Sequence, residues 1–450
     1  MSETNFSRRK FLGGAAALGA AGAMGIGPLS SCSTGDSSAG GGAIYDWKER
    51  EYNFPPMLDE VPAGNTLKAG VIGCGGRGSG AALNFLEAGG STVTITALGD
   101  VFQDRIDGCR ERIKKNHELD IPDESCFVGF DAFEKVIDSG VDIVILATPP
   151  KFRPAQFEAA VKARKHVFME KPVAVDTEGV RQVLAAAKMA DSLGLKVVTG
   201  TQRRHQHKYI NVYKDLTNNA IGALTTAEVY WNGGQLWYRN NMPEWSEMEW
   251  MIRDWVNWCW LSGDHIVEQH VHNIDVANWF FGKHPVKALG FGSRQRRPTG
   301  DQYDNFAVDY VLEDGRHITS TCRQINGCTN AVHEIIHGTK GRAFPNAGNI
   351  TDLEGNIITA YEEHETSPYV QEHKDLITCI RQNIAFNEAE NTANSVLTAI
   401  MGRVSAYTGK EVTWDEMMNS DMKLGPDTYI MGDIGYMEKA SVPVPGSDDR

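Results

Sequence analysis

Short apolar runs alternate with helix-patterned segments over residues 65–202. The runs have the continuous hydrophobicity of buried strands, and the segments between them repeat their apolar residues with a helical period. Strands are expected at 66–74, 92–100, 141–150, 166–170 and 196–202, and helices after the glycines that follow residue 73, at about 154–164 and at about 176–191. Strands separated by helices predict a parallel, doubly wound α/β sheet.

A glycine-rich turn joins the first of these strands to its helix. Gly73, Gly75 and Gly78 form the spacing G-x-G-x-x-G, with Gly76 and Arg77 inside it. Alone this spacing is weak evidence. Between a strand and a helix, however, it lets the backbone approach the pyrophosphate of a dinucleotide at the helix N-terminus. We therefore expect these five residues to bind a cofactor, and a turn that binds nothing is the alternative.

The second strand ends in a carboxylate where a dinucleotide's adenosine ribose would bind. Asp100 lies about 20 residues beyond the last glycine of the turn, the usual spacing for this role. A carboxylate there accepts hydrogen bonds from ribose hydroxyls and repels an additional phosphate, which favours NAD over NADP. NADP stays open, because Arg77 or Arg105 could hold a 2′-phosphate.

Two further strand ends carry candidate cofactor residues. The run at 141–150 ends in Ala-Thr-Pro-Pro, which contains Thr148 and Pro149, and the run at 166–170 leads into Glu170 and Lys171. Ligands of parallel sheets bind at the carboxyl ends of the strands. Lys171 is therefore expected beside the nicotinamide and the substrate.

These motifs resemble the glucose-fructose oxidoreductase, inositol dehydrogenase and rhizopine-catabolism family, written Gfo/Idh/MocA, over most of residues 65–415. The resemblance implies a Rossmann domain followed by an α/β domain with an open, largely antiparallel sheet. That sheet contributes to subunit contacts in such proteins, so a homo-oligomer is expected. The implied activity is a nicotinamide-dependent oxidation or reduction of sugars, cyclitols and related compounds.

The resemblance also locates a second group of catalytic residues, in the stretch GDHIVEQHVHNIDVANW. Family members carry an acid, a histidine four residues later and an aspartate three further, which Glu268, His272 and Asp275 match, with glutamate in place of the usual aspartate. If residues 265–280 form one helix, the three share a face. The expected base is His272, with Lys171 stabilising the developing alkoxide and Glu268 orienting or binding hydroxyls.

Other interpretations of the histidines stay open. A metal could be held by Glu268, His270, His272 and Asp275. The run HEIIH at 333–337 matches the zinc-protease pattern, but its β-branched residues and the following GTKG turn predict a strand instead of the required helix. Four other histidines are expected mainly to bond backbone groups or water, at positions 205, 207, 265 and 270.

Tryptophan is concentrated between Tyr230 and Trp260, where seven of the ten indoles lie. Indole rings pack on sugar rings and offer an N–H donor, but they also build cores and interfaces, to which we assign most of them. The candidate substrate-binding residues are Gln202, Arg203, Asp275 and Trp237.

Overall composition indicates an ordinary globular protein, since 41% of residues are hydrophobic and 23% are charged. The formal net charge of −14 argues against a nucleic-acid surface, which needs a basic patch to neutralise phosphates. A nucleic-acid partner is therefore not expected, and the resemblance to the Gfo/Idh/MocA family implies a small carbohydrate as substrate.

The N-terminal residues predict export. Arg8 and Arg9 precede an Ala/Gly-rich apolar run as in a twin-arginine signal, and Leu-Ser-Ser ahead of Cys32 resembles a lipobox whose cysteine is lipidated. The run is too short and too glycine-rich for a membrane span, so the lipid would be the membrane contact of a periplasmic or outer-membrane lipoprotein. An ordinary signal peptide is the alternative.

Five parts follow from these features. They are a signal (1–32), a tether and lead-in (33–64), a Rossmann domain (65–202), a substrate-binding α/β domain (203–415) and an irregular, surface-like C-terminal tail (416–450).

The export signal bears on the chemistry, because the twin-arginine route carries folded proteins. Free NAD is expected to be scarce outside the cytoplasm, so the protein should fold around NAD and retain it. A cofactor that stays bound must be returned to its starting oxidation state within the protein. These arguments favour an exported oxidoreductase of a sugar, glycoside or cyclitol. The alternatives are an NAD-dependent glycosidase that oxidises its substrate transiently, and a non-catalytic glycan-binding surface lipoprotein.

Overall fold

The computed structural model describes residues 52–447. The paired residues Arg8 and Arg9, the lipidation candidate Cys32 and the glycine-rich tether lie outside these residues and stay predictions. Within 52–447, no helix is long and apolar enough to cross a membrane.

The first half of the chain forms a six-stranded sheet in the order β3-β2-β1-β4-β5-β6, and each neighbouring pair is parallel. The doubly wound sheet expected from the apolar runs is confirmed. Its strands are β1 (Leu67–Ile72), β2 (Val93–Asp100), β3 (Cys126–Val128), β4 (Ile143–Leu146), β5 (His166–Met169) and β6 (Val197–Thr199).

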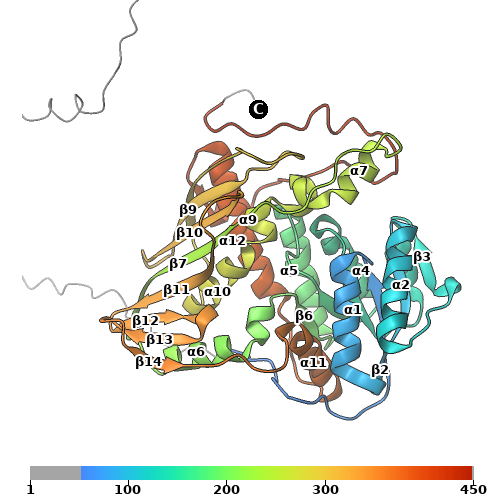
Figure 1. Ribbon diagram of the computed structural model, residues 1–450, viewed down its shortest axis with the longest axis horizontal. Helices are drawn as coiled ribbons and strands as arrows, with labels where there is room; N and C mark the ends of the chain where they lie inside the picture. The colour runs from blue at the N-terminus through green and yellow to red at the C-terminus, as the bar shows by residue number, and fades with distance from the viewer. Residues whose placement is uncertain (1–51, 448–450) are drawn as a thin grey trace, which may run out of the picture. The chain divides into compact units, whose positions relative to one another are not determined.

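Helices cover both faces of this sheet (Figure 1). The alternate residues of β4 show the two layers. Ile143 and Ile145 pack into the core beneath α1 and α11, while Val144 and Leu146 pack into the core beneath α4 and α5. The helices that follow these strands are α1 (Gly76–Gly89), α2 (Gln103–His117), α3 (Ala132–Asp138), α4 (Arg153–Lys162) and α5 (Thr177–Ser192).

The second half forms a nine-stranded sheet in the order β14-β13-β12-β11-β7-β10-β9-β8-β15. Neighbouring strands are antiparallel except β7 and β10, which run parallel, so the expected largely antiparallel sheet is confirmed. Its strands are β7 (Leu224–Gly233), β8 (Lys287–Ser293), β9 (Asn305–Val311), β10 (His317–Gln324), β11 (Ala331–Gly338), β12 (Gly341–Phe344), β13 (Asn349–Asp352), β14 (Ile357–Ala360) and β15 (Val412–Thr413).

Helices cover one face of this second sheet. Along β9, Phe306, Val308 and Tyr310 are buried against that layer, while Ala307 and Asp309 between them are exposed. The helices of this half are α6 (His207–Thr217), α7 (Glu247–Arg253), α8 (Cys259–Ser262), α9 (His265–Glu268), α10 (Val271–Phe281), α11 (Pro368–Arg381), α12 (Ala389–Thr408) and α13 (Trp414–Met418). Helix α11 packs on α1 of the first half, although the two are far apart in sequence.

The expectation of one helix over 265–280 is wrong, because α9 ends at Glu268 and α10 begins at Val271. In a continuous helix the carbonyl of Glu268 would accept from the amide of His272. Instead it accepts a hydrogen bond from the Lys171 ammonium at 2.5 Å, and the His272 amide donates to the carbonyl of Gln269. The contact with Lys171 thus occupies the carbonyl of Glu268, which a continuous helix would need as its hydrogen-bond acceptor.

The C-terminal tail is irregular, as expected, but it is not a free surface segment. Beyond α13 it has no helix or strand through residue 447. Tyr429 stacks on the buried ring of Trp260 with 6.2 Å between centroids, and the Ile434 amide donates to Glu247 of α7 at 2.6 Å. The tail therefore runs past α7 and holds the segment that joins β7 to α9 (Figure 1).

Candidate active site

A cavity of about 460 Å³ lies at the carboxyl edge of the parallel sheet. Seven of the expected cofactor residues line it, namely Gly73, Gly75, Gly76, Arg77, Asp100, Thr148 and Pro149. The segment between β7 and α9 supplies much of the opposite wall, with Trp237, Arg239, Ile252, Arg253 and Trp255. Sequence reasoning named only Trp237 of this wall, as a candidate substrate residue, because nothing in the segment's composition shows which sheet it covers.

The glycine turn fits a pyrophosphate. A Cβ atom placed on Gly75 or Gly76 would meet no atom within 4 Å, so the backbone there faces open space. Helix α1 begins at Gly76 with no side-chain cap and no acidic residue in its first turn, which leaves its amides and positive dipole end for an anion. Gly73 and Gly78 serve the turn itself: Gly73 has φ +90°, and a Cβ on Gly78 would lie 1.7 Å from the Gly73 carbonyl oxygen.

Asp100 ends β2 in the cavity wall, where a ribose would bind. Its carboxylate accepts from the amide of Cys74 at 2.7 Å and from the amide of Phe102 at 3.0 Å. Burial raises the pKa of Asp100, and the two amides partly oppose that shift. Each carboxylate oxygen keeps further acceptor capacity, so the group fits ribose hydroxyls. Arg105 lies in the same wall.

Arg77 connects the glycine turn to the end of β5. Its Nε donates to the carboxylate of Glu170, and its Nη2 lies 3.7 Å from Glu372 of α11. The guanidinium also lies 4.8 Å from the ring centroid of Tyr369. Burial opposes the charged guanidinium, but the carboxylate of Glu170 outweighs it and raises the pKa of Arg77. No local sequence pattern links α11 to this site.

Lys171 and Glu268 form a buried ion pair with 3.1 Å between Nζ and Oε1. Gln269 donates to the other carboxylate oxygen at 2.6 Å. The turn that carries Lys171 is held by Arg153, whose guanidinium donates to the backbone carbonyls on either side of Lys171 at 3.0 and 2.7 Å. The structure therefore brings together two of the three expected catalytic residues, one from each half of the chain.

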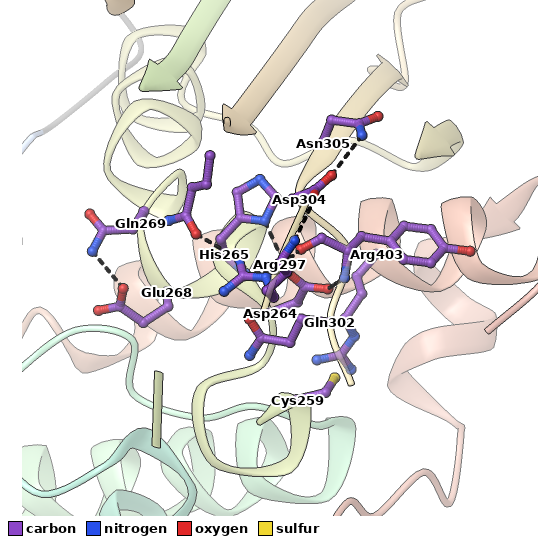
Figure 2. Close-up of polar contacts among 12 residues, drawn as sticks. Cys259, Asp264, His265, Glu268, Gln269, Arg297, Gln302, Asp304, Asn305 and Arg403 are labelled. Carbon is purple, nitrogen blue, oxygen red and sulfur yellow. Dashed lines mark hydrogen bonds and ion pairs between the residues drawn. The ribbon is translucent and has the colours of Figure 1, made fainter. Parts of the chain in front are cut away.

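A buried polar network supports the N-terminal end of α9. Asp264, which precedes the helix, accepts from the amide of His265 and, at 2.9 Å, from the amide of Tyr303. Arg403 of α12 donates to the carbonyl of the residue before Asp264 at 2.9 Å. Figure 2 shows Asp264, His265 and Arg403 close together, with Glu268 and Gln269 to one side of them. Glu268 thus projects from a rigidly supported helix end.

His272 is 7% exposed and stacks on Trp231, with 5.6 Å between ring centroids. Its buried ring Nδ1 has no hydrogen-bond partner among residues 52–447. Burial and the nearby charges of Lys171, Arg203 and Arg77 hold its pKa well below the ordinary histidine value. The ring is therefore neutral and can accept a proton.

Arg203 is anchored beside His272 by a residue that sequence reasoning missed. Its guanidinium pairs with the fully buried Glu334, which also accepts from Asn273 at 2.7 Å and from the Tyr209 hydroxyl at 3.1 Å. Arg203 lies 5.7 Å from the ring centroid of Trp231. Glu334 belongs to the HEIIH run, which is the predicted strand, β11, and not a zinc-protease helix.

Three candidate substrate residues have distinct surroundings. Asp275 is buried and accepts from both ends of the Arg204 guanidinium, at 2.8 and 2.9 Å, which gives it a supporting role in the core, and its contact with a substrate stays a prediction. Gln202 has a buried side-chain oxygen with no partner among residues 52–447. Trp237 is 47% exposed and lines the cofactor cavity.

The four-residue metal hypothesis is not supported by the geometry. Glu268 pairs with Lys171, Asp275 pairs with Arg204, and His270 bonds the Ser320 hydroxyl at 2.7 Å. In the part of the chain that the structure describes, no three His, Cys, Asp or Glu side chains are grouped to hold a metal ion.

The other histidines have structural partners, although these are side chains more often than the expected backbone groups. The contacts are His205 with Asp375 and Glu388, His265 with Asp264, and His207 with the ring of His364.

Comparisons with known proteins agree with this architecture. Residues 67–198 match the family described as "Oxidoreductase family, NAD-binding Rossmann fold", and residues 210–344 match the "GFO/IDH/MocA C-terminal domain". Myo-inositol 2-dehydrogenase of Thermotoga maritima is 23% identical over 70% of this chain and 88% of that enzyme. An inositol 2-dehydrogenase of Rubrobacter xylanophilus is 28% identical over 65% of this chain and 73% of that enzyme.

Solved structures show the same fold. Scyllo-inositol dehydrogenase from Lactobacillus casei, with bound NAD(H) and scyllo-inositol, aligns with a TM-score of 0.59 and 21% identity over 78% of this chain and 99% of that chain. Aldose-aldose oxidoreductase from Caulobacter crescentus aligns with a TM-score of 0.60 and 20% identity over 78% and 100% of the two chains.

Proposed function

The chain belongs to the GFO/IDH/MocA family of oxidoreductases, and we propose that it oxidises and reduces a secondary alcohol of a sugar, glycoside or cyclitol with a tightly held NAD. The observation that carries the proposal is the Lys171–Glu268 pair with the neutral His272 near it, connected to the cofactor cavity through Arg77, which lines the cavity and bonds the residue before Lys171. The names of the relatives, which act on inositols and aldoses, support the substrate class.

Bound NAD would supply the hydride acceptor and donor. The chain would hold its pyrophosphate at the glycine turn and the N-terminus of α1, and its adenosine ribose at Asp100. The carboxylate of Asp100 supports NAD over NADP, since it would repel a 2′-phosphate.

The proton chemistry falls to the chain's own side chains. His272, neutral because of burial and nearby cations, accepts the hydroxyl proton as hydride leaves the carbon. The Lys171 ammonium donates a hydrogen bond to the developing alkoxide and stabilises its charge. Glu268 holds Lys171 in place through both its carboxylate and its backbone carbonyl.

The cavity wall supports cofactor retention. Arg253 lies 3.9 Å from the ring centroid of Phe102 and bonds both carboxylate oxygens of Asp104, at 3.1 and 3.2 Å, so it ties the segment between β7 and α9 to α2. The C-terminal tail holds that segment in turn. A cofactor enclosed in this way would be oxidised and reduced in place, and it would have to bind before export.

The proposal is tested by asking what the purified protein carries. Denaturation should release NAD, and a panel of sugars, glycosides and cyclitols should change the absorbance of the native protein at 340 nm. Release of an aglycone with no net change at 340 nm would assign the redox-neutral glycosidase cycle instead. A protein that releases no nicotinamide and binds none would refute the proposal in favour of a glycan-binding scaffold.

A further inference from the structure

Arg77 places a positive charge at the catalytic end of the cofactor cavity. It is the second residue of α1, where Cα–Cβ bonds tilt toward the helix N-terminus, so its side chain leans over the glycine turn toward the end of β5. There its Nε donates to Glu170, the residue before Lys171. Its charge also contributes to the lowered pKa of His272.

Two carboxyl groups face Arg77, but they differ in charge. Glu170 accepts directly from the guanidinium. Glu372 is fully buried, and neither of its oxygens has a hydrogen-bond partner among residues 52–447. Burial raises the pKa of Glu372 well above its ordinary value. Burial therefore favours the neutral acid at Glu372, and the directly bonded Arg77 and Glu170 form the pair of opposite charges at this end of the cavity.

We propose that the Arg77–Glu170 pair sets the relative affinity of the site for oxidised and reduced nicotinamide. The inference rests on the proposed use of NAD. The oxidised ring carries a positive charge and the reduced ring is neutral, while the rest of the dinucleotide is the same in both. An unbalanced charge beside the ring therefore changes the affinities for the oxidised and reduced forms by different amounts. A balanced pair suits a protein that must oxidise and reduce with one retained cofactor.

The test uses variants that unbalance the pair in opposite directions. Glu170→Gln keeps an acceptor oxygen for Arg77 but removes the negative charge, so the ratio of the dissociation constants for NAD⁺ and NADH should rise about tenfold. Arg77→Gln leaves Glu170 unbalanced and should lower that ratio about tenfold. Glu372→Gln replaces a neutral acid by a neutral amide of the same shape, and its ratio should match the wild type.

A mediated redox titration of the purified protein, read at 340 nm, reports this ratio as the midpoint potential of the bound couple. Each tenfold change in the ratio shifts the potential by about 30 mV. The inference is overturned if Glu170→Gln and Arg77→Gln keep the wild-type potential, even where Arg77→Gln weakens both forms equally, because that result would assign Arg77 to the pyrophosphate. A Glu372→Gln shift as large as that of Glu170→Gln would also overturn it. A wild type that binds neither form refutes the proposed function instead.

Discussion

Lys171 and Glu268 are joined twice, once through the carboxylate at 3.1 Å and once through the backbone carbonyl at 2.5 Å. The second bond lies where α9 ends, and His272 follows in the first turn of α10, near enough to the same ammonium for its charge to lower the pKa of the ring. The base and the cation of the proposed mechanism are therefore positioned by one contact between the two domains.

Removal of either group should cost turnover more than folding. Lys171→Ala and His272→Ala are each expected to lower turnover by about 10² or more, the usual scale for a positioned proton-transfer group. Cofactor content after purification should stay near the wild-type level. Lys135→Ala removes a lysine from an exposed pair with Asp131 and serves as the matched surface control. Unchanged turnover in both site variants would exclude the assigned mechanism.

Alcohol oxidation should stay active to a lower pH than it would with a histidine base of ordinary pKa. Oxidation requires neutral His272, and activity is lost only when pH falls through its pKa. Because that pKa is held well below 6.5, the acid limb of kcat/KM should lie below pH 6.5. A pH profile of kcat/KM, with folding checked at each pH, measures this limb. An acid limb at or above pH 6.5 would contradict the assignment of His272 as the base.

Asp100 should determine the choice of cofactor. Asp100→Ala removes charge-assisted hydrogen bonds to the ribose, worth about 1.5–3 kcal/mol, so NAD binding should weaken. Any preference for NAD over NADP should become smaller. Dissociation constants for both cofactors, measured on the wild type and the variant, test this. A wild type that already carries NADP would show that the electrostatic argument is wrong.

His205 should make stability depend on pH in the alkaline range. Its ring lies 2.7 Å from Asp375 and 3.1 Å from Glu388. Burial opposes the charged ring, but these carboxylates raise the pKa of His205 to about 10. The folded state thus keeps a proton that the unfolded chain releases near 6.5, so the stabilisation is complete below about pH 6.5 and is lost as pH rises through about 10.

The stability difference between wild type and His205→Gln isolates this contribution. The free energy of unfolding, obtained from urea titrations at pH 6.5, 8 and 10, should favour the wild type most at pH 6.5 and least at pH 10. A difference that is constant with pH would mean that His205 does not carry the charge.

Export should depend on cofactor binding if Arg8 and Arg9 direct the twin-arginine route. An empty site lacks ligand-linked stabilisation, which is about 2.7 kcal/mol at a hundredfold excess of ligand over its dissociation constant. Gly75→Val places its side chain in open space facing the cavity, so it should block the pyrophosphate without a clash in the protein. The exported fraction of Gly75→Val should fall below that of Lys171→Ala, which stays loaded. Equal export of the two variants would separate the signal from the cofactor.

The sequence by itself determined the parallel sheet and the outline of the cofactor site. Continuous apolar runs can be buried on both faces only when helices cover them. Gly75 and Asp100 lie at the ends of such strands, and the helix that follows each strand begins a few residues later in the chain. Their roles depend on local backbone geometry, which short stretches specify. The strand around Glu334 was predictable for the same reason.

Tertiary structure decided how the charged groups are paired. Lys171 bonds the carbonyl of Glu268 where α9 ends, Arg77 pairs with Glu170 after β5, and Glu334 fixes Arg203. These contacts join residues that no local period relates, and each is strong only because burial removes the competing water. The pKa shift of His272 and the proposed balance of charge around the nicotinamide both arise from that burial.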